Sequence, residues 1–198
     1  MIIGITGTLG AGKGTVVERL KEKGFNHYSA RAFISREIER RGLPVNRDTM
    51  TSVGNDLRAR HGPAYVFESL LREAKQAGGD TVLESLRTVG EIDALKAADG
   101  YLIAVDANPK IRYERVVLRG SETDTISFEQ FLADEEREST SQDPGEQNLR
   151  KVAAMADATI RNDGTVEQLR EKVDDCLAKL LTRLKNSGPA RGGSRNER

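Results

Sequence analysis

The sequence predicts an α/β fold in which a mostly parallel five-stranded sheet lies between two layers of helices. Short apolar runs alternate along the chain with helical patterns, and this alternation is typical of βαβ units. In addition, 198 residues with 37% hydrophobic content are enough for one domain with its own core. Because ligands bind such sheets at the carboxyl ends of the strands, the residues that follow each strand are the first candidates for function.

Strands are predicted at short runs, most of which are apolar and rich in β-branched residues. In chain order these runs cover 2–6, 25–29, 81–83, 101–105 and 158–160. Helices are predicted where apolar residues recur at helical spacing. These segments cover 13–23, 31–41, 46–60, 63–77, 89–97, 109–119, 127–138 and 165–184. We expect Pro63 in the first turn of its helix, and we expect Gly78 and Gly120 to end two others.

The remaining segments are polar. Residues 121–125 and 139–145 are predicted to be loops. Residues 186–198 consist mainly of Gly, Ser, Asn and Arg with almost nothing apolar, which predicts a disordered tail. The predicted organisation is therefore one domain over residues 1–185, followed by that tail.

Charge and composition exclude several classes of protein. Lys and Arg total 31, as do Asp and Glu, so the formal net charge is zero, which disfavours a protein that coats nucleic acid or an anionic membrane. The single cysteine, Cys176, excludes an internal disulfide and a cysteine-cage zinc site. No apolar run approaches the roughly 18–20 residues that span a bilayer, and the first residues lack the features of a signal peptide. We therefore expect a cytoplasmic protein with no membrane partner.

The most specific motif follows the first strand, where residues 7–15 read Gly-Thr-Leu-Gly-Ala-Gly-Lys-Gly-Thr. Glycines let backbone N–H groups turn inward around an anion. The next helix presents its free N–H groups to the same anion, and Lys13 supplies a charge for the outer phosphates. The motif predicts a phosphate loop (P-loop) that binds ATP. Its predicted ATP-binding residues are Gly7, Gly10, Ala11, Gly12, Lys13, Gly14 and Thr15.

This Gly-x-x-Gly-x-Gly-Lys-Gly-Thr variant resembles the phosphate loop of adenylate kinase and related nucleoside monophosphate kinases. It departs from the strict pattern because Gly14, not Ser or Thr, follows Lys13. The resemblance implies a P-loop three-layer α/β/α sandwich with ATP and Mg²⁺ as cofactors. It also implies acceptor-binding helices over about 31–77, a lid over about 112–145, and Thr15 on the phosphates with magnesium held largely through waters.

Other phosphate-loop classes fit less well. The Asn-Lys-x-Asp and Asp-x-x-Gly strings of GTPase switches do not occur. A large AAA-type motor needs an apolar strand that ends in Asp-Glu. Asp134 and Glu135 stand instead in a segment whose apolar residues have the spacing of an amphipathic helix.

Glu84 follows the third predicted strand, where a carboxylate can organise the waters of magnesium. The stretch Glu84-Ser85-Leu86-Arg87 is similar to the Asp-Gly-x-x-Arg stretch of nucleoside monophosphate kinases, with Glu in place of Asp. That similarity implies that Arg87 grips the phosphate of the acceptor. The alternative is a surface turn with a stray charge pair.

Further arginines are expected because phosphoryl transfer depends on positioning and charge neutralisation. Arg112, Arg115 and Arg119 recur at helical spacing and so share one face. Residues 106–109 and this helix resemble the lid entry of nucleoside monophosphate kinases and dephospho-coenzyme A kinase. The resemblance implies that Arg119 lies against the ATP base and that Arg137 reaches the transferred phosphate. The alternative is a solvated helix face. The predicted catalytic set is Lys13, Arg87, Arg119 and Arg137.

Two more segments complete the predicted site. After the second strand, Arg31 and Arg36 join Arg87 as acceptor-binding candidates, although Ala32 stands about where the kinase family commonly has Asp; Arg58 is a weaker candidate. Residues 158–165 resemble the Asn-x-Gly turn of dephospho-coenzyme A kinase. This implies that Asn162 lies in a turn whose backbone touches adenine; the alternative is an ordinary helix-start turn.

The hypothesis from the sequence is an ATP- and magnesium-dependent kinase of a small nucleotide, with a (deoxy)nucleoside monophosphate as the first candidate acceptor. One alternative is a ribose-hydroxyl kinase similar to dephospho-coenzyme A kinase. Others are an ATP-binding accessory module with slow hydrolysis and a kinase of a nucleotide within nucleic acid, which the neutral charge disfavours. Either a monomer or a homodimer is compatible with the sequence.

Overall fold

The computed structural model describes residues 1–120, 127–139 and 147–186, and it confirms the predicted fold class. Five strands form one sheet in the order β2-β3-β1-β4-β5, and every neighbouring pair is parallel. The strands are β1 (Ile2–Thr6), β2 (Asn26–Ser29), β3 (Thr81–Glu84), β4 (Tyr101–Asp106) and β5 (Ala158–Arg161). Because β1 is central, the loop that follows it lies in the middle of the carboxyl edge.

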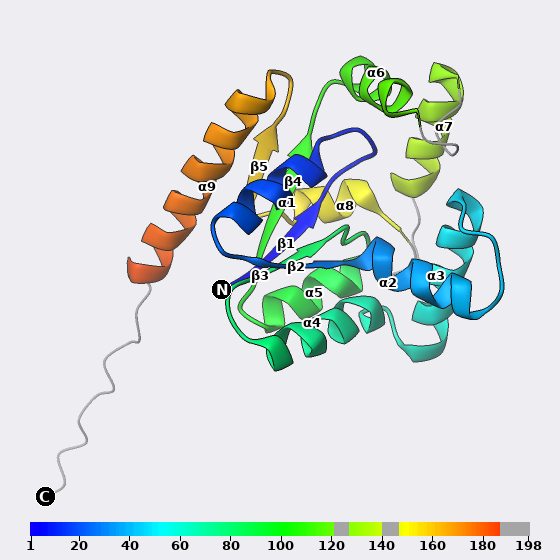
Figure 1. Ribbon diagram of the computed structural model, residues 1–198, viewed down its shortest axis with the longest axis horizontal. Helices are drawn as coiled ribbons and strands as arrows, with labels where there is room; N and C mark the ends of the chain where they lie inside the picture. Colours follow the sequence, from blue (N-terminus) through cyan, green and yellow to red (C-terminus); the bar gives the residue numbers. More distant parts are fainter. Residues whose placement is uncertain (121–126, 140–146, 187–198) are drawn as a thin grey trace, which may run out of the picture.

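The described helices lie in three groups around this sheet (Figure 1). One face is covered by α1 (Lys13–Glu22) and α9 (Val166–Asn186). The opposite face is covered by α4 (Tyr65–Ala77), α5 (Val89–Ala97) and α8 (Leu149–Ala154), and α2 (Ala30–Arg40) and α3 (Arg47–His61) extend this layer. The third group, α6 (Pro109–Arg119) and α7 (Phe128–Ser139), lies beyond the carboxyl edge.

The alternation of side chains in β1 explains the two layers. Ile3 and Ile5 are fully buried against α1 and α9. Gly4 faces the other layer, where a Cβ atom would lie 2.6 Å from Leu95 Cδ2. Since successive strand residues point to opposite faces, one apolar strand supplies both cores, and glycine leaves room for α5 to approach the sheet.

Some boundaries differ from the prediction. The short helix α8 was not predicted, and α4 begins at Tyr65, so Pro63 precedes the helix instead of opening it. The Pro63 carbonyl accepts a hydrogen bond from Thr88 Oγ1 at 3.3 Å. Thr88 is the N-cap of α5, so this bond links the segment before α4 to the start of α5. Asn186 ends α9, and the rest of the predicted tail lies outside the described residues.

Other predictions also fall partly outside the described residues. The predicted loop at 121–125 lies entirely there, and of the predicted loop at 139–145 the structure describes only Ser139, the last residue of α7. Over the ranges that are described, no helix is long and apolar enough to cross a membrane.

Candidate functional site

The phosphate loop joins β1 to α1 and depends on glycine at defined points. Gly12 is the N-cap of α1 and has φ 98°, a left-handed conformation that favours glycine. Gly10 has φ 77°, and a Cβ atom there would lie 2.4 Å from the carbonyl oxygen of Arg112. The loop therefore passes so close to α6 that a larger residue at Gly10 would force the backbone apart.

Asn162, just after β5, forms a hydrogen bond to the backbone of the phosphate loop. Its Nδ2 donates to the carbonyl of Ala11 at 2.9 Å, and its side chain is buried. A Cβ atom on Gly12 would lie 2.2 Å from the same Nδ2. The side chain of Asn162 thus positions the loop, whereas contact between this turn and adenine stays a prediction.

Lys13 folds back over the loop it follows. Its Nζ donates to the carbonyl oxygens of Gly7 at 2.8 Å and Thr8 at 2.9 Å. Thr8 Oγ1 is buried and has no hydrogen-bond partner among the described residues, an arrangement that suits a bound phosphate oxygen or water. A glycine cradle, a lysine and this hydroxyl fit the phosphates of ATP.

The position after Lys13 also distinguishes this loop. A Cβ atom on Gly14 would meet nothing within 4 Å, so glycine is not required there by packing. Thr15 lies one residue further along the first turn of α1 and is half-buried. Its predicted contact with phosphate or metal-bound water stays a prediction.

Glu84 ends β3, next to β1, and is held by a histidine. His27 Nε2 of β2 lies 3.1 Å from Glu84 Oε2. Burial raises the pKa of the Glu84 carboxyl, but the hydrogen bond and charge of His27 and the charges of Lys13 and Arg31 outweigh it, so this pKa is lowered. Glu84 is therefore an ionised carboxylate near neutral pH, as a group that orders metal-bound water must be.

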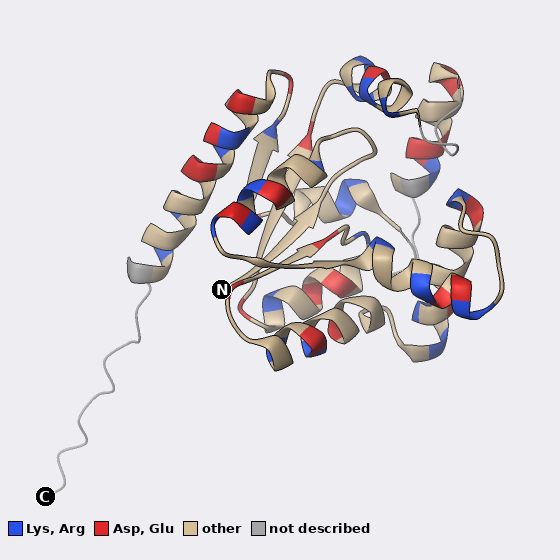
Figure 2. Cartoon of the chain, viewed as in Figure 1, with Lys and Arg blue, Asp and Glu red and all other residues tan. Residues whose placement is uncertain are grey.

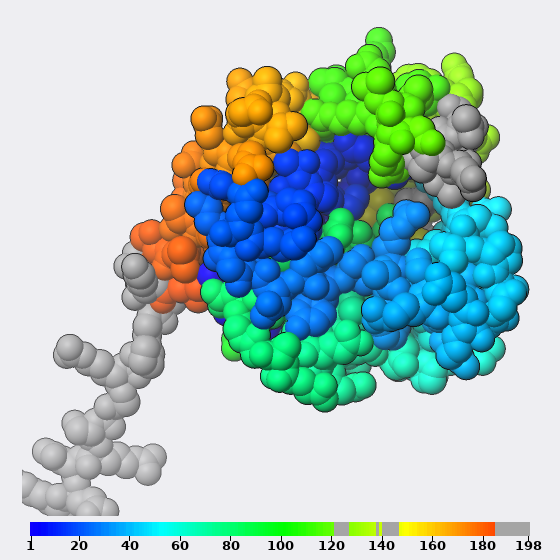
Figure 3. Space-filling model, in the orientation of Figure 1, coloured from blue at the N-terminus to red at the C-terminus, as the bar shows by residue number. Residues whose placement is uncertain are grey.

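A pocket opens between the phosphate loop and the helices α2 and α3, and the space-filling view is hollowed there (Figure 3). The cavity measures about 190 Å³. Among its lining residues six are cationic and one is acidic, although the whole chain has no net charge and its helices carry both signs (Figure 2). The lining residues are Leu9, Lys13, Ala30, Arg31, Ile34, Arg47, Met50, Thr51, Arg58, Glu84, Ser85, Arg87, Arg119 and Gln147.

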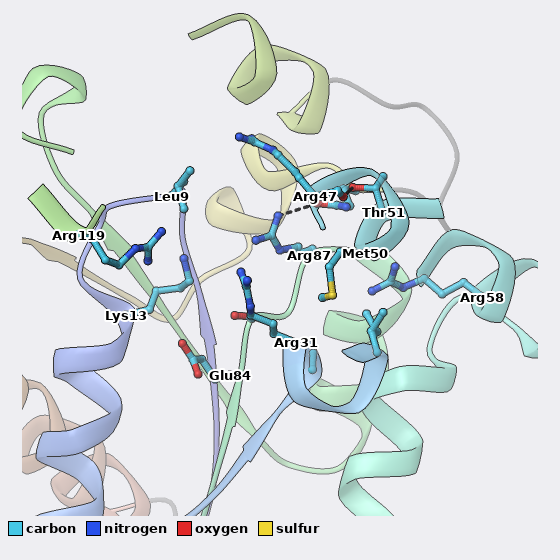
Figure 4. A pocket seen from close by; sticks show the side chains of 14 residues that line it. Leu9, Lys13, Arg31, Arg47, Met50, Thr51, Arg58, Glu84, Arg87 and Arg119 are labelled. Carbon is cyan, nitrogen blue, oxygen red and sulfur yellow. Dashed lines mark hydrogen bonds between the residues drawn. The ribbon is translucent and has the colours of Figure 1, made fainter. Parts of the chain in front are cut away.

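The structure thus brings together several predicted site residues that are far apart in sequence. Lys13, Arg31 and Arg87 point toward the same space, and Arg119 of α6 lies beside Lys13 (Figure 4). Arg87 Nη1 donates to Gln147 Oε1 at 2.7 Å, which fixes the guanidinium across the pocket. A cluster of cations from separate elements is suited to bind an anionic ligand.

The turn that carries Arg87 is strained. Ser85 has φ 71°, a conformation that is uncommon for a residue other than glycine. The N–H groups of Ser85 and Leu86 both donate to the carbonyl of Ile5, at 3.0 and 3.1 Å. These bonds to the central strand compensate the unfavourable conformation and direct the chain into the pocket.

Arg58, the weaker candidate for acceptor binding, forms a buried ion pair with Glu91. Its Nε and Nη2 donate to Glu91 Oε1 at 3.1 and 2.8 Å, and the Glu91 side chain is fully buried. Glu91 Oε2 accepts from the backbone N–H groups of Arg87 at 2.8 Å and Thr88 at 3.2 Å. One carboxylate therefore ties helix α3 to the turn that carries Arg87.

Two of the predicted site arginines do not line the pocket. Arg36 is exposed, lies 3.6 Å from Glu73 Oε1 and stacks over Phe33. Arg137 is exposed and pairs with Asp134 one turn earlier in α7, at 3.1 Å. Arg36 follows Arg31 by five residues, about 140° around the helix, so the two arginines cannot face the same pocket.

Two of the three arginines of α6 bond to neighbouring segments. Arg112 is buried, pairs with Glu135 of α7, and donates to the carbonyl of Ala107 at 2.8 Å. Arg115 Nη1 donates to the carbonyl of Asn162 at 3.0 Å. Arg112 and Arg115 therefore hold neighbouring backbone carbonyls. Of the three arginines predicted to share one face, Arg119 alone lines the pocket.

Sequence reasoning missed several residues of the site: Thr8, Arg47, Met50, Thr51 and Gln147. Thr8 could have been found, because it stands inside the phosphate loop. The other four carry no local signal, since their place in the pocket depends on the packing of α3 and on the segment that enters α8.

Comparison with known proteins identifies the family. A family model described as AAA domain (AAA_18) matches residues 3–143. A UPF0200 protein from Pyrobaculum aerophilum is 31% identical over 182 residues, which cover 90% of this chain and 98% of that protein. A UPF0200 protein from Thermococcus sibiricus is also 31% identical, over 91% of this chain and 95% of its own length. Asp134 and Glu135 nevertheless lie on the helix α7, as predicted, and not at the end of a strand.

Solved structures share the fold at low sequence identity. Protein TT1252 from Thermus thermophilus has a TM-score of 0.63 at 22% identity and covers 91% of this chain and 97% of its own. A gluconokinase from Sinorhizobium meliloti has 0.58 at 16%, covering 94% and 97%. A shikimate kinase from Aquifex aeolicus has 0.55 at 16%, covering 92% and 99%. Given these matches, the chain belongs to the AAA domain family AAA_18 and to the UPF0200 proteins, and it has a P-loop kinase-like fold.

Proposed function

We propose that this protein is an ATP- and Mg²⁺-dependent kinase that transfers the γ-phosphoryl group to a small anionic acceptor, with a (deoxy)nucleoside monophosphate as the first candidate. The observation that carries the proposal is the continuous pocket that joins the phosphate loop to an arginine-rich acceptor end. The fold likeness to a gluconokinase and a shikimate kinase supports phosphoryl transfer but does not name this acceptor.

In the proposed reaction, the phosphate loop and Lys13 bind the phosphates of ATP, and Arg119 covers the nucleotide from α6. Magnesium, when bound with ATP, neutralises charge on the β- and γ-phosphates. Thr15 and Glu84 are placed in the first turn of α1 and at the end of β3, where they would hold its waters. No group of three or more His, Cys, Asp or Glu side chains within the described ranges forms a metal cage, so the metal would be held chiefly by the nucleotide.

At the other end of the pocket, Arg31 and Arg87 would bind the acceptor phosphate and direct one of its oxygens toward the γ-phosphorus. A phosphate acceptor is already an oxyanion and needs little help from a general base. The apolar side chains of Ile34 and Met50 lie at this end and could contact a base or sugar. Arg36 and Arg137 would need to move to take part, since neither lines the pocket.

A second candidate acceptor is a hydroxyl group, as in the alternative similar to dephospho-coenzyme A kinase. One observation favours it: the Glu84 carboxylate lies inside the pocket, next to His27, where it could accept a hydroxyl proton. The number of arginines in the pocket favours the phosphate acceptor over this one.

The proposal is tested by measuring ADP release from Mg-ATP with a panel of acceptors: the common ribo- and deoxyribonucleoside monophosphates, dephospho-coenzyme A, shikimate, gluconate and single-stranded oligonucleotides. A monophosphate that raises ADP release over the acceptor-free rate, with loss of that rate in Lys13→Ala, supports the proposal. Stimulation only by a hydroxyl acceptor or an oligonucleotide selects that alternative. Turnover that no acceptor changes would favour an ATP-hydrolysing accessory module.

A further inference from the structure

Helix α7 connects the two ends of the pocket through adjacent carboxylates. Asp134 Oδ2 lies 3.1 Å from Arg47 Nη1, and Arg47 lines the acceptor end. The next residue, Glu135, pairs with Arg112, whose Nη1 also lies 3.5 Å from the carbonyl of Leu9 in the phosphate loop. We call this pair of links, Asp134–Arg47 and Glu135–Arg112, the α7 bridge.

The acceptor-side link starts from a fixed backbone. Arg47 is the first residue of α3 and lies within a capping box, in which Asn46 and Thr49 satisfy each other's backbone N–H groups at 2.9 and 3.0 Å. Met50 and Thr51 of the same first turns also line the pocket, and Figure 4 shows Arg47 extending above Arg87. The position of Arg47 is thus set by the same turn that forms the acceptor wall.

Asp134 is a buried carboxylate, with 6% of the residue exposed. Its Oδ1 accepts from Gln130 Nε2 at 2.8 Å and lies 3.1 Å from Arg137 Nη2, both on α7 itself. Arg47 is its partner from another element. Because a buried carboxylate needs its charged partners, the place of α7 depends on a residue of the acceptor wall.

We propose that Arg47 is an acceptor-positioning residue that binds the anionic group of the acceptor and Asp134 at the same time. A guanidinium can do this because its planar fork carries five N–H donors. An occupied acceptor site then holds α7 against α3. Through Glu135 and Arg112 the same helix reaches the phosphate loop, so acceptor binding stabilises the ATP end of the pocket. The inference rests on the proposed function only for the identity of the anion.

The test uses the full chain and four variants: Arg47→Ala, Arg47→Lys, Asp134→Asn and the control Arg60→Ala. Arg60 lies on α3 like Arg47, but it is exposed and pairs with Asp56 on its own helix. Thermal melts verify that each variant folds. Binding of AMP, CMP, GMP and UMP is measured by calorimetry, and amide hydrogen exchange of α7 is measured with and without the bound nucleotide.

We expect Arg47→Ala to weaken binding of the nucleotide by about ten- to a hundredfold, the usual loss for a charged hydrogen bond. Arg47→Lys should lose less, and Arg60→Ala should bind as the wild type does. The nucleotide should slow exchange of α7 in the wild type and in Arg60→Ala, but not in Asp134→Asn, which keeps the shape of the side chain and removes its charge.

Three results would overturn the inference: wild-type affinity in Arg47→Ala, no change of α7 exchange on nucleotide binding to the wild type, or no binding of any of the four nucleotides. The proposed function fails separately. Nucleotide binding that requires Arg47 and protects α7, without phosphoryl transfer from ATP, would reject the kinase and leave this inference in place.

Discussion

The buried carboxylate of Glu91 offers a sharp test of how the proposed acceptor end of the pocket is held together. It accepts two hydrogen bonds from Arg58 and two from backbone N–H groups, at 2.8 to 3.2 Å, in a fully buried position. Glu91→Gln keeps the shape but leaves Arg58 as a buried cation without its counter-charge. The new amide nitrogen is itself a donor, so it would face either the N–H groups of Arg58 or the backbone N–H groups of Arg87 and Thr88, which are also donors.

Removing one partner of a buried ion pair costs about 3–5 kcal/mol. In a chain of this size each kcal/mol lowers the midpoint of thermal unfolding by roughly 2–4 °C. Glu91→Gln should therefore melt roughly 6–20 °C below the wild type. Urea denaturation should give the matching loss in free energy of unfolding with an unchanged m-value.

Two comparisons make the result specific. Glu73→Gln removes the exposed partner of Arg36 and should change stability by less than about 0.5 kcal/mol. The double variant Arg58→Met/Glu91→Gln should be more stable than Glu91→Gln alone by at least about 1 kcal/mol, because the buried cation is gone. A Glu91→Gln protein within about 1 kcal/mol of the wild type would refute the proposed role of the pair.

Three further outcomes are expected. Ser85→Gly should raise the free energy of unfolding by about 0.5–1 kcal/mol, since glycine adopts φ 71° without strain; a loss of stability in urea would show that the serine side chain matters more than the backbone. Asn162→Asp, which cannot donate to the carbonyl of Ala11, should weaken ATP binding by about tenfold in calorimetry, and unchanged affinity would refute its role in holding the loop. The hydrogen bond from Arg19 lowers the pKa of Asp174 to about 2, so its stabilising contribution is present above its ordinary pKa and is lost as the pH falls toward 2. The stability difference between wild type and Asp174→Asn should therefore shrink over that interval, and a constant difference down to pH 2 would contradict this.

The fold was accessible from the sequence because most strands are short apolar runs and each long helix has a periodic apolar face. The elements that differ are those without such a signal. Helix α8 has six residues and is held by tertiary contacts and the Asn148 cap, in which Asn148 Oδ1 accepts from the N–H of Lys151 at 2.9 Å. Pro63 has a typical helix-start position, but α4 starts two residues later, at Tyr65, and the Pro63 carbonyl accepts a hydrogen bond from Thr88.

The candidate site was accessible where a residue stands in the segment that follows a strand or, for Arg119, in the predicted lid-entry helix. Lys13, Glu84 and Arg87 meet that condition, and the pocket contains all three. Arg47 stands at the start of α3, within the proposed acceptor segment, and its partner Asp134 is 87 positions later in the chain, so no local pattern marks it. Arg58 illustrates the opposite case, because its buried partner Glu91 gives it a structural role that the sequence does not reveal.

The central claim is that one pocket presents ATP to an anionic acceptor held by arginines. The most direct measurement follows a label in the γ-phosphoryl group of ATP to its product by mass, with the wild type, Lys13→Ala and Arg87→Ala. The account predicts label on the acceptor with the wild type, none with Lys13→Ala, and a much reduced yield at low acceptor concentration with Arg87→Ala. Label found only in inorganic phosphate for every acceptor would contradict it.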